Sequence, residues 1–324
     1  MPRVLSGIQP SGKMHLGNYA GAIRQFLDLQ ESGNEIFIFV ASYHALTSTR
    51  DPVALRENIR QVVIDYLAYG LDPARTSIYV QHDVPEVCEL TWLLNCVCPM
   101  SWMEKAVSYK DKIAKGLSPS VGLFTYPILQ AADILAVDAA IVPVGRDQVQ
   151  HLELTRDIAA RFNESYATQT FTLPAYRLAA NAETVPGIDG EKMSKSYGNT
   201  IDPFEDEKAL RKRIMSITTD SAPMEAVKDP ETCTIFKIYR AVAGTTDQRT
   251  LDLAARYRAG GMGYGHAKLA LFDLLMDHFG PARARRQELL TRPDYVTQVL
   301  ADGAHAARTL ARATLLRARA AVGL

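Results

Sequence analysis

Two short groups of residues in this sequence could bind the phosphates of a nucleotide. In the first, a strand-like segment leads into the glycine-rich turn at residues 9–12 (QPSG), and a helix is expected to begin near His15 and Asn18. Backbone N–H groups and the positive end of the helix dipole favour an anion at such a helix start. His15 and Asn18 lie three positions apart, so both side chains can face the same phosphate oxygens. Taken alone, an ordinary turn explains this segment at least as well.

The second group is the pentapeptide at residues 192–196 (KMSKS), in a loop flanked by glycines at 187, 190 and 198. Lys192 and Lys195 could hold a triphosphate and stabilise the charge that develops on a leaving pyrophosphate. A K-x-x-K pattern by itself is usually a solvated basic loop. The complete pentapeptide lies downstream of the first group and after the strand patterns have ended. The two groups together, in this order, favour the phosphate interpretation for both.

The elements that must position these groups alternate between strand and helix along the first half of the chain. Strands are expected at residues 4–7, 35–41, 77–81 and 140–144, and helices from residues 18 and 51 and at 87–98, 126–135 and 147–162. This rhythm favours an α/β fold with a doubly wound parallel sheet, which binds ligands at the carboxyl ends of its strands. Gly145, Asp147 and Gln148 follow directly after a strand and are therefore candidates for ligand contact.

The alternation stops near Tyr176, and residues 181–191 form a loop-like segment with two glycines and a proline. Beyond this loop the sequence is helical with little strand pattern. We therefore predict an α/β domain at residues 1–190 and a helical domain at residues 191–294. The alanine- and arginine-rich segment at about 295–324 is predicted to be a helix that packs back on the first domain.

Composition narrows the class of protein. The 324 residues carry 36 basic and 36 acidic side chains, so a nucleic acid would have to bind local basic patches. No apolar run approaches the ~20 residues that span a bilayer, so no membrane association is expected. The chain starts without a signal-peptide pattern, and its four cysteines are expected to be reduced thiols in the cytoplasm. Cys96 and Cys98 lack the spacing of a zinc pair, and no zinc is expected.

The two phosphate-binding groups resemble the signature motifs of class I aminoacyl-tRNA synthetases. Within that class, several blocks are similar to the bacterial-type tryptophanyl-tRNA synthetase family. These blocks are GIQPSG at 7–12, GNYAGAIRQF at 17–26, AADIL at 131–135 and VPVGRDQVQHLELTRDIAARFN at 142–163. The tyrosyl relatives usually have histidine where this chain has Asn18. The resemblance covers the whole chain and is densest at residues 4–200.

The resemblance implies an ATP-dependent ligase. Its members join tryptophan and ATP to form tryptophanyl-adenylate and pyrophosphate, and then transfer tryptophan to the 3′-terminal adenosine of its tRNA. It also implies a Rossmann-like catalytic domain, a helical anticodon-binding domain and a homodimer. Mg²⁺ is expected to accompany the triphosphate, held mainly by the phosphates, because the sequence offers no dedicated carboxylate cage.

The resemblance also implies particular site residues. Those implied to stabilise the reacting phosphates are His15, Asn18, Lys112, Lys192 and Lys195. Those implied to contact ATP are Gln9, Pro10, Ser11, Gly17, Asn18, Gly145, Asp147, Gln148, Lys192, Met193, Ser194, Lys195 and Ser196. Those implied to form the tryptophan pocket are Leu5, Val40, His44, Tyr126, Gln130, Asp133, Val142, Val144 and Gln148. Asp133 is expected to accept the hydrogen bond of the indole N–H, which is a donor only.

Two positions depart from the family pattern. Gln130 stands where many bacterial relatives have methionine, and it could add a polar contact to the pocket. Cys233 stands where some relatives begin a set of four cysteines that binds an iron–sulfur cluster, but no cysteine follows it. We therefore expect no such cluster. Three other interpretations stay open: a tyrosyl enzyme, a shorter-type nucleotidyltransferase with an H-x-G-H motif, and a non-catalytic paralogue that binds tryptophan or RNA.

Overall fold

The computed structural model describes residues 1–105, 120–145, 148–178 and 184–324, so the predicted site residues Lys112 and Asp147 lie outside the described residues. The first described elements are β1 (Arg3–Ile8), α1 (Leu16–Asn18), a π-helical turn (Tyr19–Ile23), α2 (Arg24–Glu31), β2 (Glu35–Val40), α3 (Ser42–Ala45), α4 (Pro52–Tyr69), β3 (Thr76–Val80) and the 3-10 turn η2 (Gln81–Asp83). Next come α5 (Glu86–Asn95), α6 (Met100–Glu104), α8 (Val121–Ala136), β4 (Ile141–Val144), α9 (Val149–Ser165) and β5 (Ala175–Leu178). The last are η4 (Lys195–Tyr197), α10 (Glu207–Met215), α11 (Thr234–Ala243), α12 (Gln248–Ala259), α13 (Tyr264–Leu290) and α14 (Pro293–Val322).

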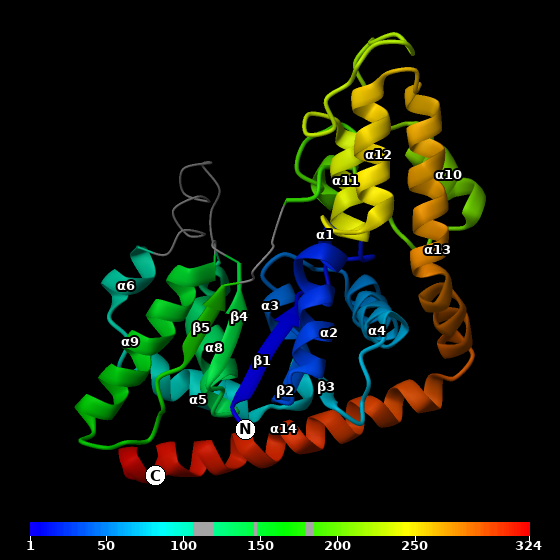
Figure 1. Cartoon of the computed structure of the whole chain (residues 1–324). Helices are drawn as coiled ribbons and strands as arrows, with labels where there is room; N and C mark the ends of the chain where they lie inside the picture. The colour runs from blue at the N-terminus through cyan, green and yellow to red at the C-terminus, as the bar shows by residue number, and fades with distance from the viewer. Residues whose placement is uncertain (106–119, 146–147, 179–183) are drawn as a thin grey trace.

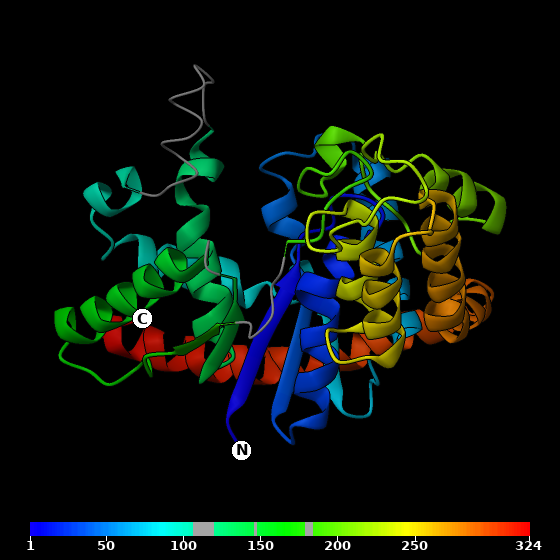
Figure 2. The same cartoon turned by 45° about the horizontal axis from the view of Figure 1, so that its top comes forward.

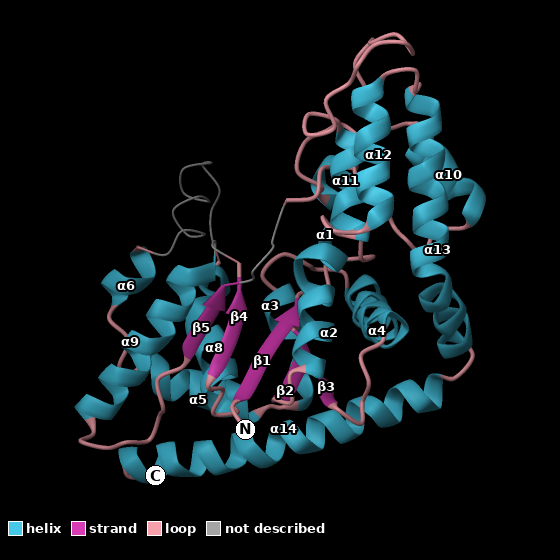
Figure 3. Ribbon diagram, in the orientation of Figure 1, coloured by secondary structure: helices cyan, strands magenta, loops and turns pink. Residues whose placement is uncertain are grey.

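The strands form one parallel sheet in the order β3-β2-β1-β4-β5 (Figure 3). The chain first builds outward from β1 to β3 and then crosses to build β4 and β5 on the other side. The predicted doubly wound α/β fold is therefore confirmed. The reversal of direction places a crevice between the carboxyl ends of β1 and β4, where this class of fold binds its ligands.

Both faces of the sheet are covered by helices, as parallel sheets require. Along β2, Ile36, Ile38 and Val40 join a core with the π-helical turn, α2 and α4. Phe37 and Phe39 point to the opposite face and join a second core with α5, α8, α9 and α14. Successive residues of a strand point to opposite faces, so this division follows directly from the pleat.

The helices α10–α13 stand at the end of the sheet where the strands finish, beside α1 (Figures 1 and 2). The N–H of Leu16 donates to the carbonyl of Ile201 at 2.9 Å and so joins α1 to the segment that leads into these helices. The C-terminal half of α13 packs on α4. The second phosphate-binding group thus lies directly between the sheet and the helical part.

The last helix, α14, runs along the base of the sheet and packs on β3 and α5 (Figure 1). The helix comes very near the strand at Gly303, where a Cβ atom would stand 1.9 Å from the carbonyl oxygen of Ile78. Only glycine lets the helix lie this near the strand backbone. The division of the chain at residues 190 and 294 remains a prediction.

Local sequence signals explain most of the element boundaries. Asp51 caps α4, because its carboxylate accepts from the N–H groups of Val53 and Ala54, and Pro52 takes the first helical position. The elements that were not predicted include the short helices α3 and α6, the edge strand β5 and the π-helical turn that directly follows Asn18.

Candidate active site

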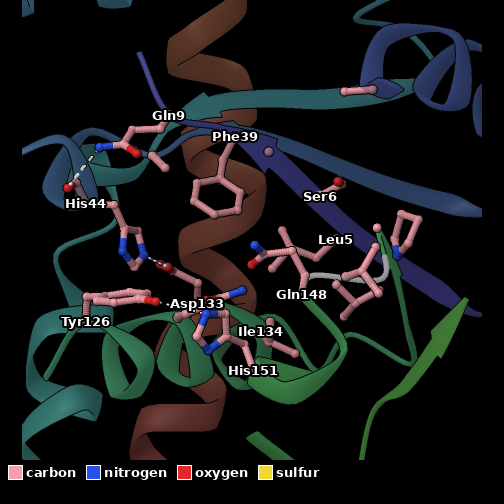
Figure 4. Close-up of a pocket in the computed structure, with 18 of the residues that line it drawn as sticks. Leu5, Ser6, Gln9, Phe39, His44, Tyr126, Asp133, Ile134, Gln148 and His151 are labelled. Atoms are coloured by element: carbon pink, nitrogen blue, oxygen red, sulfur yellow. Dashed lines mark hydrogen bonds and ion pairs between the residues drawn. The ribbon is translucent and has the colours of Figure 1, made fainter. Parts of the chain in front are cut away.

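A cavity of about 510 Å³ opens at the carboxyl ends of β1 and β4 (Figure 4). Its lining residues come from eight elements: β1, the π-helical turn, α2, β2, α3, α8, β4 and α9. Ten of the residues predicted to bind tryptophan or ATP line it: Leu5, Gln9, His44, Tyr126, Gln130, Asp133, Val142, Val144, Gly145 and Gln148. The cavity therefore brings together residues that lie far apart in the sequence.

Asp133 forms the polar floor of the cavity. It lies on α8, its side chain is 3% exposed, and its carboxylate accepts hydrogen bonds from two neighbours. His44 Nε2 lies 3.0 Å from Oδ2, and Gln81 Nε2 lies 2.9 and 2.8 Å from the two oxygens. A buried carboxylate needs such partners, because an unpaired charge in the interior is costly. Gln81 was not predicted from the sequence.

A second polar group stands on the α9 side. The hydroxyl of Tyr126 lies 2.9 Å from Nε2 of His151, and the two rings meet edge to face. His151 lines the cavity but was not predicted. It follows Gln148 by three positions at the start of α9, so both lie on the same helix face. That spacing is the signal that could have found it.

Apolar side chains form the walls of the cavity: Leu5, Phe39, Val142, Val144 and Ile134. The prediction that Val40 forms part of this wall is wrong. Val40 points to the α4 side of β2, in the other core, and Phe39 takes its place (Figure 4). The strand is apolar on both faces, so the sequence carried no alternation that would tell the two positions apart.

The first motif lies beside the cavity. The backbone N–H of His15 donates to Oδ1 of Asn18 at 3.1 Å, which closes the first turn of α1. Gly17 must be small, because a Cβ there would lie 2.9 Å from Nδ1 of His15. Burial lowers the pKa of His15 to about 4, with a smaller contribution from the charge of Lys195. His15 is therefore neutral at physiological pH.

The second motif lies against the first. Lys195 Nζ donates to the carbonyl of Gly12 at 2.9 Å and to Oγ of Ser11 at 3.2 Å. Burial lowers the pKa of Lys195, and Asp65 and Asp202 act in the opposite direction. Met193 is buried in the core, whereas Lys192 and Ser196 are exposed. Of the two lysines, Lys195 is thus the one placed at the glycine-rich turn.

The loop of the second motif has a defined conformation. The N–H of Ser194 donates to Oδ1 of Asn199 at 2.8 Å, and Nδ2 of Asn199 donates to the carboxylate of Asp189 at 2.8 and 3.1 Å. An antiparallel bridge between Pro186 and Lys192 closes the turn. This framework holds the loop from which Lys195 contacts the turn at residues 9–12.

Three other features bear on cofactors and location. In the described ranges, no group of three His, Cys, Asp or Glu side chains is placed to hold a metal ion. The four cysteines, all of which are described, form no disulfides. The described helices include none that is both long and apolar enough to cross a membrane.

Comparison with known proteins shows the family to which the chain belongs. The family model described as tRNA synthetases class I (W and Y) matches residues 1–280, and the chain belongs to this family. Relatives that match over the full length of the chain include tryptophan–tRNA ligases. A tryptophan–tRNA ligase of Rhodopirellula baltica is 52% identical over 322 residues, covering 99% of each chain, and that of Fusobacterium nucleatum is 50% identical, covering 100% of this chain and 98% of the relative. The crystal structure of tryptophanyl-tRNA synthetase from Campylobacter jejuni, complexed with ADP and tryptophan, is 47% identical and superposes with a TM-score of 0.91, covering 99% of this chain and 100% of that one.

Proposed function

We infer that this protein is a tryptophan–tRNA ligase, which activates tryptophan with ATP and transfers it to its tRNA. The observation that carries this function is the buried carboxylate of Asp133 at the floor of an apolar cavity, beside two phosphate-binding motifs. The indole N–H can only donate, so an acceptor in an apolar slot matches tryptophan. An amino acid without such a donor would leave the carboxylate with an unused acceptor, which costs affinity.

We propose that the indole ring lies between Leu5, Phe39 and Val144, with its N–H directed at Asp133. The ammonium group would then point to the hydroxyl of Tyr126 and the amide of Gln148, which stand on the α9 side of the cavity. In this pose the carboxylate of tryptophan faces Gln9, which lines the same cavity (Figure 4). His44 supports the floor and lies edge to face with Tyr126.

We propose that ATP binds across the first motif, with Gln9, Gly17 and Asn18 at the nucleotide and the phosphates between residues 9–12 and the second motif. Lys195 already lies at this turn, and the exposed Lys192 is free of the core and can approach the phosphates. The carboxylate of tryptophan is the nucleophile, so the protein supplies orientation and positive charge rather than a covalent intermediate. The roles of Lys112 and Asp147 remain proposals, as both lie outside the described residues.

Mg²⁺ would be carried by the triphosphate. Since the described residues offer no three-ligand carboxylate group, they do not fit a dedicated metal cage. They do fit an ion bound mainly through phosphate oxygens, which is how Mg²⁺ usually enters nucleotide sites. When bound, the ion would neutralise part of the phosphate charge.

We further propose a homodimer located in the cytoplasm, with residues 1–190 as the catalytic domain and residues 191–294 as the anticodon-binding domain. Trp92 on α5 and Met100 on α6 are 68% and 65% exposed, and association of two chains would cover such large apolar side chains. The free cysteines fit a reducing compartment. Local basic residues such as Lys208 and Arg211 on α10 are candidates for tRNA phosphate contacts.

The test is ATP–pyrophosphate exchange with tryptophan and tyrosine measured in parallel. We expect exchange that depends on tryptophan, with tyrosine supporting it only weakly. Exchange with tyrosine alone would overturn the role of Asp133. Exchange with neither amino acid would overturn the ligase function and favour a binding protein on the same fold.

A further inference from the structure

Gln81 stands behind the amino-acid pocket and has no role in the function proposed above. It follows β3 directly, is 1% exposed and does not line the cavity. Its side-chain nitrogen lies within hydrogen-bond distance of both oxygens of Asp133, at 2.9 and 2.8 Å. A buried glutamine aimed at the specificity residue requires an explanation, because burying an amide is costly unless its groups are satisfied.

The orientation of this amide is fixed by its other contact. Oε1 of Gln81 accepts from the backbone N–H of Tyr43 at 2.8 Å. A backbone N–H can only donate, so the oxygen must face Tyr43 and the NH₂ group must face the carboxylate. The backbone of α3 therefore determines which end of Gln81 meets Asp133.

These contacts leave the Asp133 carboxylate able to accept a further hydrogen bond on one side only, the side that faces the cavity. Gln81 donates to both oxygens from the β3 side, and His44 donates to Oδ2 from α3. A carboxylate has about four acceptor positions, so capacity remains on the side that lines the cavity. Held in this way, Asp133 presents an acceptor to the substrate and cannot rotate away.

We propose that Gln81 is a positioning residue for amino-acid selection: it holds Asp133 as an oriented hydrogen-bond acceptor, so that a ring with an N–H is selected over a ring of the same shape without one. This inference rests on the proposed tryptophan ligase function. It assigns Gln81 no contact with the substrate. Its effect should therefore appear in the choice between amino acids and not in the handling of ATP.

The first test compares tryptophan with β-(3-benzothienyl)alanine, in which sulfur replaces the indole N–H, in the exchange assay of the full chain. In Gln81→Met we expect the KM for tryptophan to rise at least about tenfold, as for the loss of a charge-assisted hydrogen bond. The KM for the sulfur analogue should change much less, so the preference for tryptophan falls by a similar factor. The KM for ATP should stay close to that of the unaltered protein.

Gln30 provides a matched control. It is also a buried glutamine, and it is bound at the opposite end of β3, where it accepts from the N–H of Asp72 and from Oγ1 of Thr76. Gln30→Met should lower stability in a comparable way and leave the preference for tryptophan unchanged. An equal loss of preference in Gln30→Met and Gln81→Met would reduce Gln81 to a general structural role and overturn the proposal.

A second variant keeps the proposal testable if Gln81→Met folds poorly. Gln81→Glu retains the shape and the acceptor for Tyr43, and at low pH the protonated carboxyl can donate a hydrogen bond to Asp133 as the amide does. Two carboxylates this close cannot both be charged at low cost, and the shared proton is lost as the pH rises. We expect the KM for tryptophan in Gln81→Glu to be near normal at acid pH and to rise with pH.

The other ionisable side chains around Asp133 do not obscure this result. His44 and Tyr79 also face Asp133, but both are present in the unaltered protein, so the difference between the two pH profiles isolates position 81. Parallel profiles would overturn the proposal. If the unaltered protein shows no tryptophan-dependent exchange, the ligase function itself fails. If it shows exchange and the variants keep full preference, only the role of Gln81 fails.

Discussion

At the scale of the residue, the burial of His15 makes a defined contribution to how stability depends on pH. Burial lowers the pKa of this imidazole to about 4, from the 6.5 that holds when the chain is unfolded. Between these values the unfolded chain binds a proton that the folded chain does not, so acid favours unfolding. The contribution of His15 is present above pH 6.5 and is lost as the pH falls toward 4.

We therefore expect acidification across this window to cost on the order of 1 kcal/mol through His15 alone, after allowance for solvent screening. The measurement is the free energy of unfolding in urea at several pH values, for the unaltered protein and for His15→Gln. The variant should lose less stability on acidification. Equal slopes for the two proteins would contradict a neutral, buried imidazole.

The candidate site could be predicted from the sequence where its residues carry short local patterns. The two motifs and the block after Val142 are contiguous in the sequence, and the start of that block, including Val142, Val144, Gly145 and Gln148, lines the cavity. Gln81 and His151 were missed because their importance depends on partners 52 and 25 residues away, Asp133 and Tyr126. Val40 was predicted in place of Phe39 because both faces of β2 are apolar. The pleat of the strand alone decides which of the two side chains meets the cavity.

At the scale of the element, α14 can pack closely on β3 because Gly303 has no side chain. A Cβ there would stand 1.9 Å from the oxygen and 2.6 Å from the carbonyl carbon of Ile78. Gly303→Ala must therefore push the helix away from the strand, and we expect a loss of about 1–3 kcal/mol in the free energy of unfolding. Thermal and urea unfolding measure this loss.

The control is Gly280→Ala in α13, where a Cβ would meet nothing within 4 Å. Alanine is the better helix former, so this variant should gain about 0.5–1 kcal/mol. The two substitutions are chemically identical and both lie inside helices. A similar effect from both would mean that helix propensity, not contact with β3, determines the result.

The elements themselves were predictable to different degrees. β1 to β4 and the helices that cover them follow strong periodicity and clear caps such as Asp51. The edge strand β5 has four exposed residues and no alternation, and its backbone pairing with β4 is what makes it a strand. The π-helical turn after Asn18 also carries no sequence pattern, since it depends on how the first motif packs.

At the scale of the whole molecule, one buried ion pair joins the α/β part to the long helix α13. Nε of Arg286 lies 2.7 Å from Oδ1 of Asp65 on α4, and the two side chains are 15% and 3% exposed. Arg286 also hydrogen-bonds Gln61 and lies 5.0 Å from the centre of the Phe204 ring. Because Phe204 follows the second motif, this pair connects α4, α13 and the segment that leads from the lysine loop.

Removing one partner of this ion pair should lower the free energy of unfolding far more than removing both. Arg286→Met leaves Asp65 buried and uncompensated, and we expect a loss of about 3–5 kcal/mol in the free energy of unfolding at neutral pH. Asp65→Leu combined with Arg286→Met should recover most of it, since no unpaired charge remains. A double-mutant cycle of urea unfolding measures the coupling.

The loss of stability in Arg286→Met should also depend on pH, and the pKa of Asp65 gives the direction of this dependence. Burial raises the pKa of Asp65 to about 6, while the hydrogen bond and charge of Arg286 act to lower it. Without Arg286 the folded-state pKa of Asp65 rises further above 6, so the damage in Arg286→Met should shrink as the pH falls toward 6 and level off below it. Damage that is the same at acid and neutral pH would show that Arg286 stabilises the protein through its packing on Phe204 and not through the charge of Asp65.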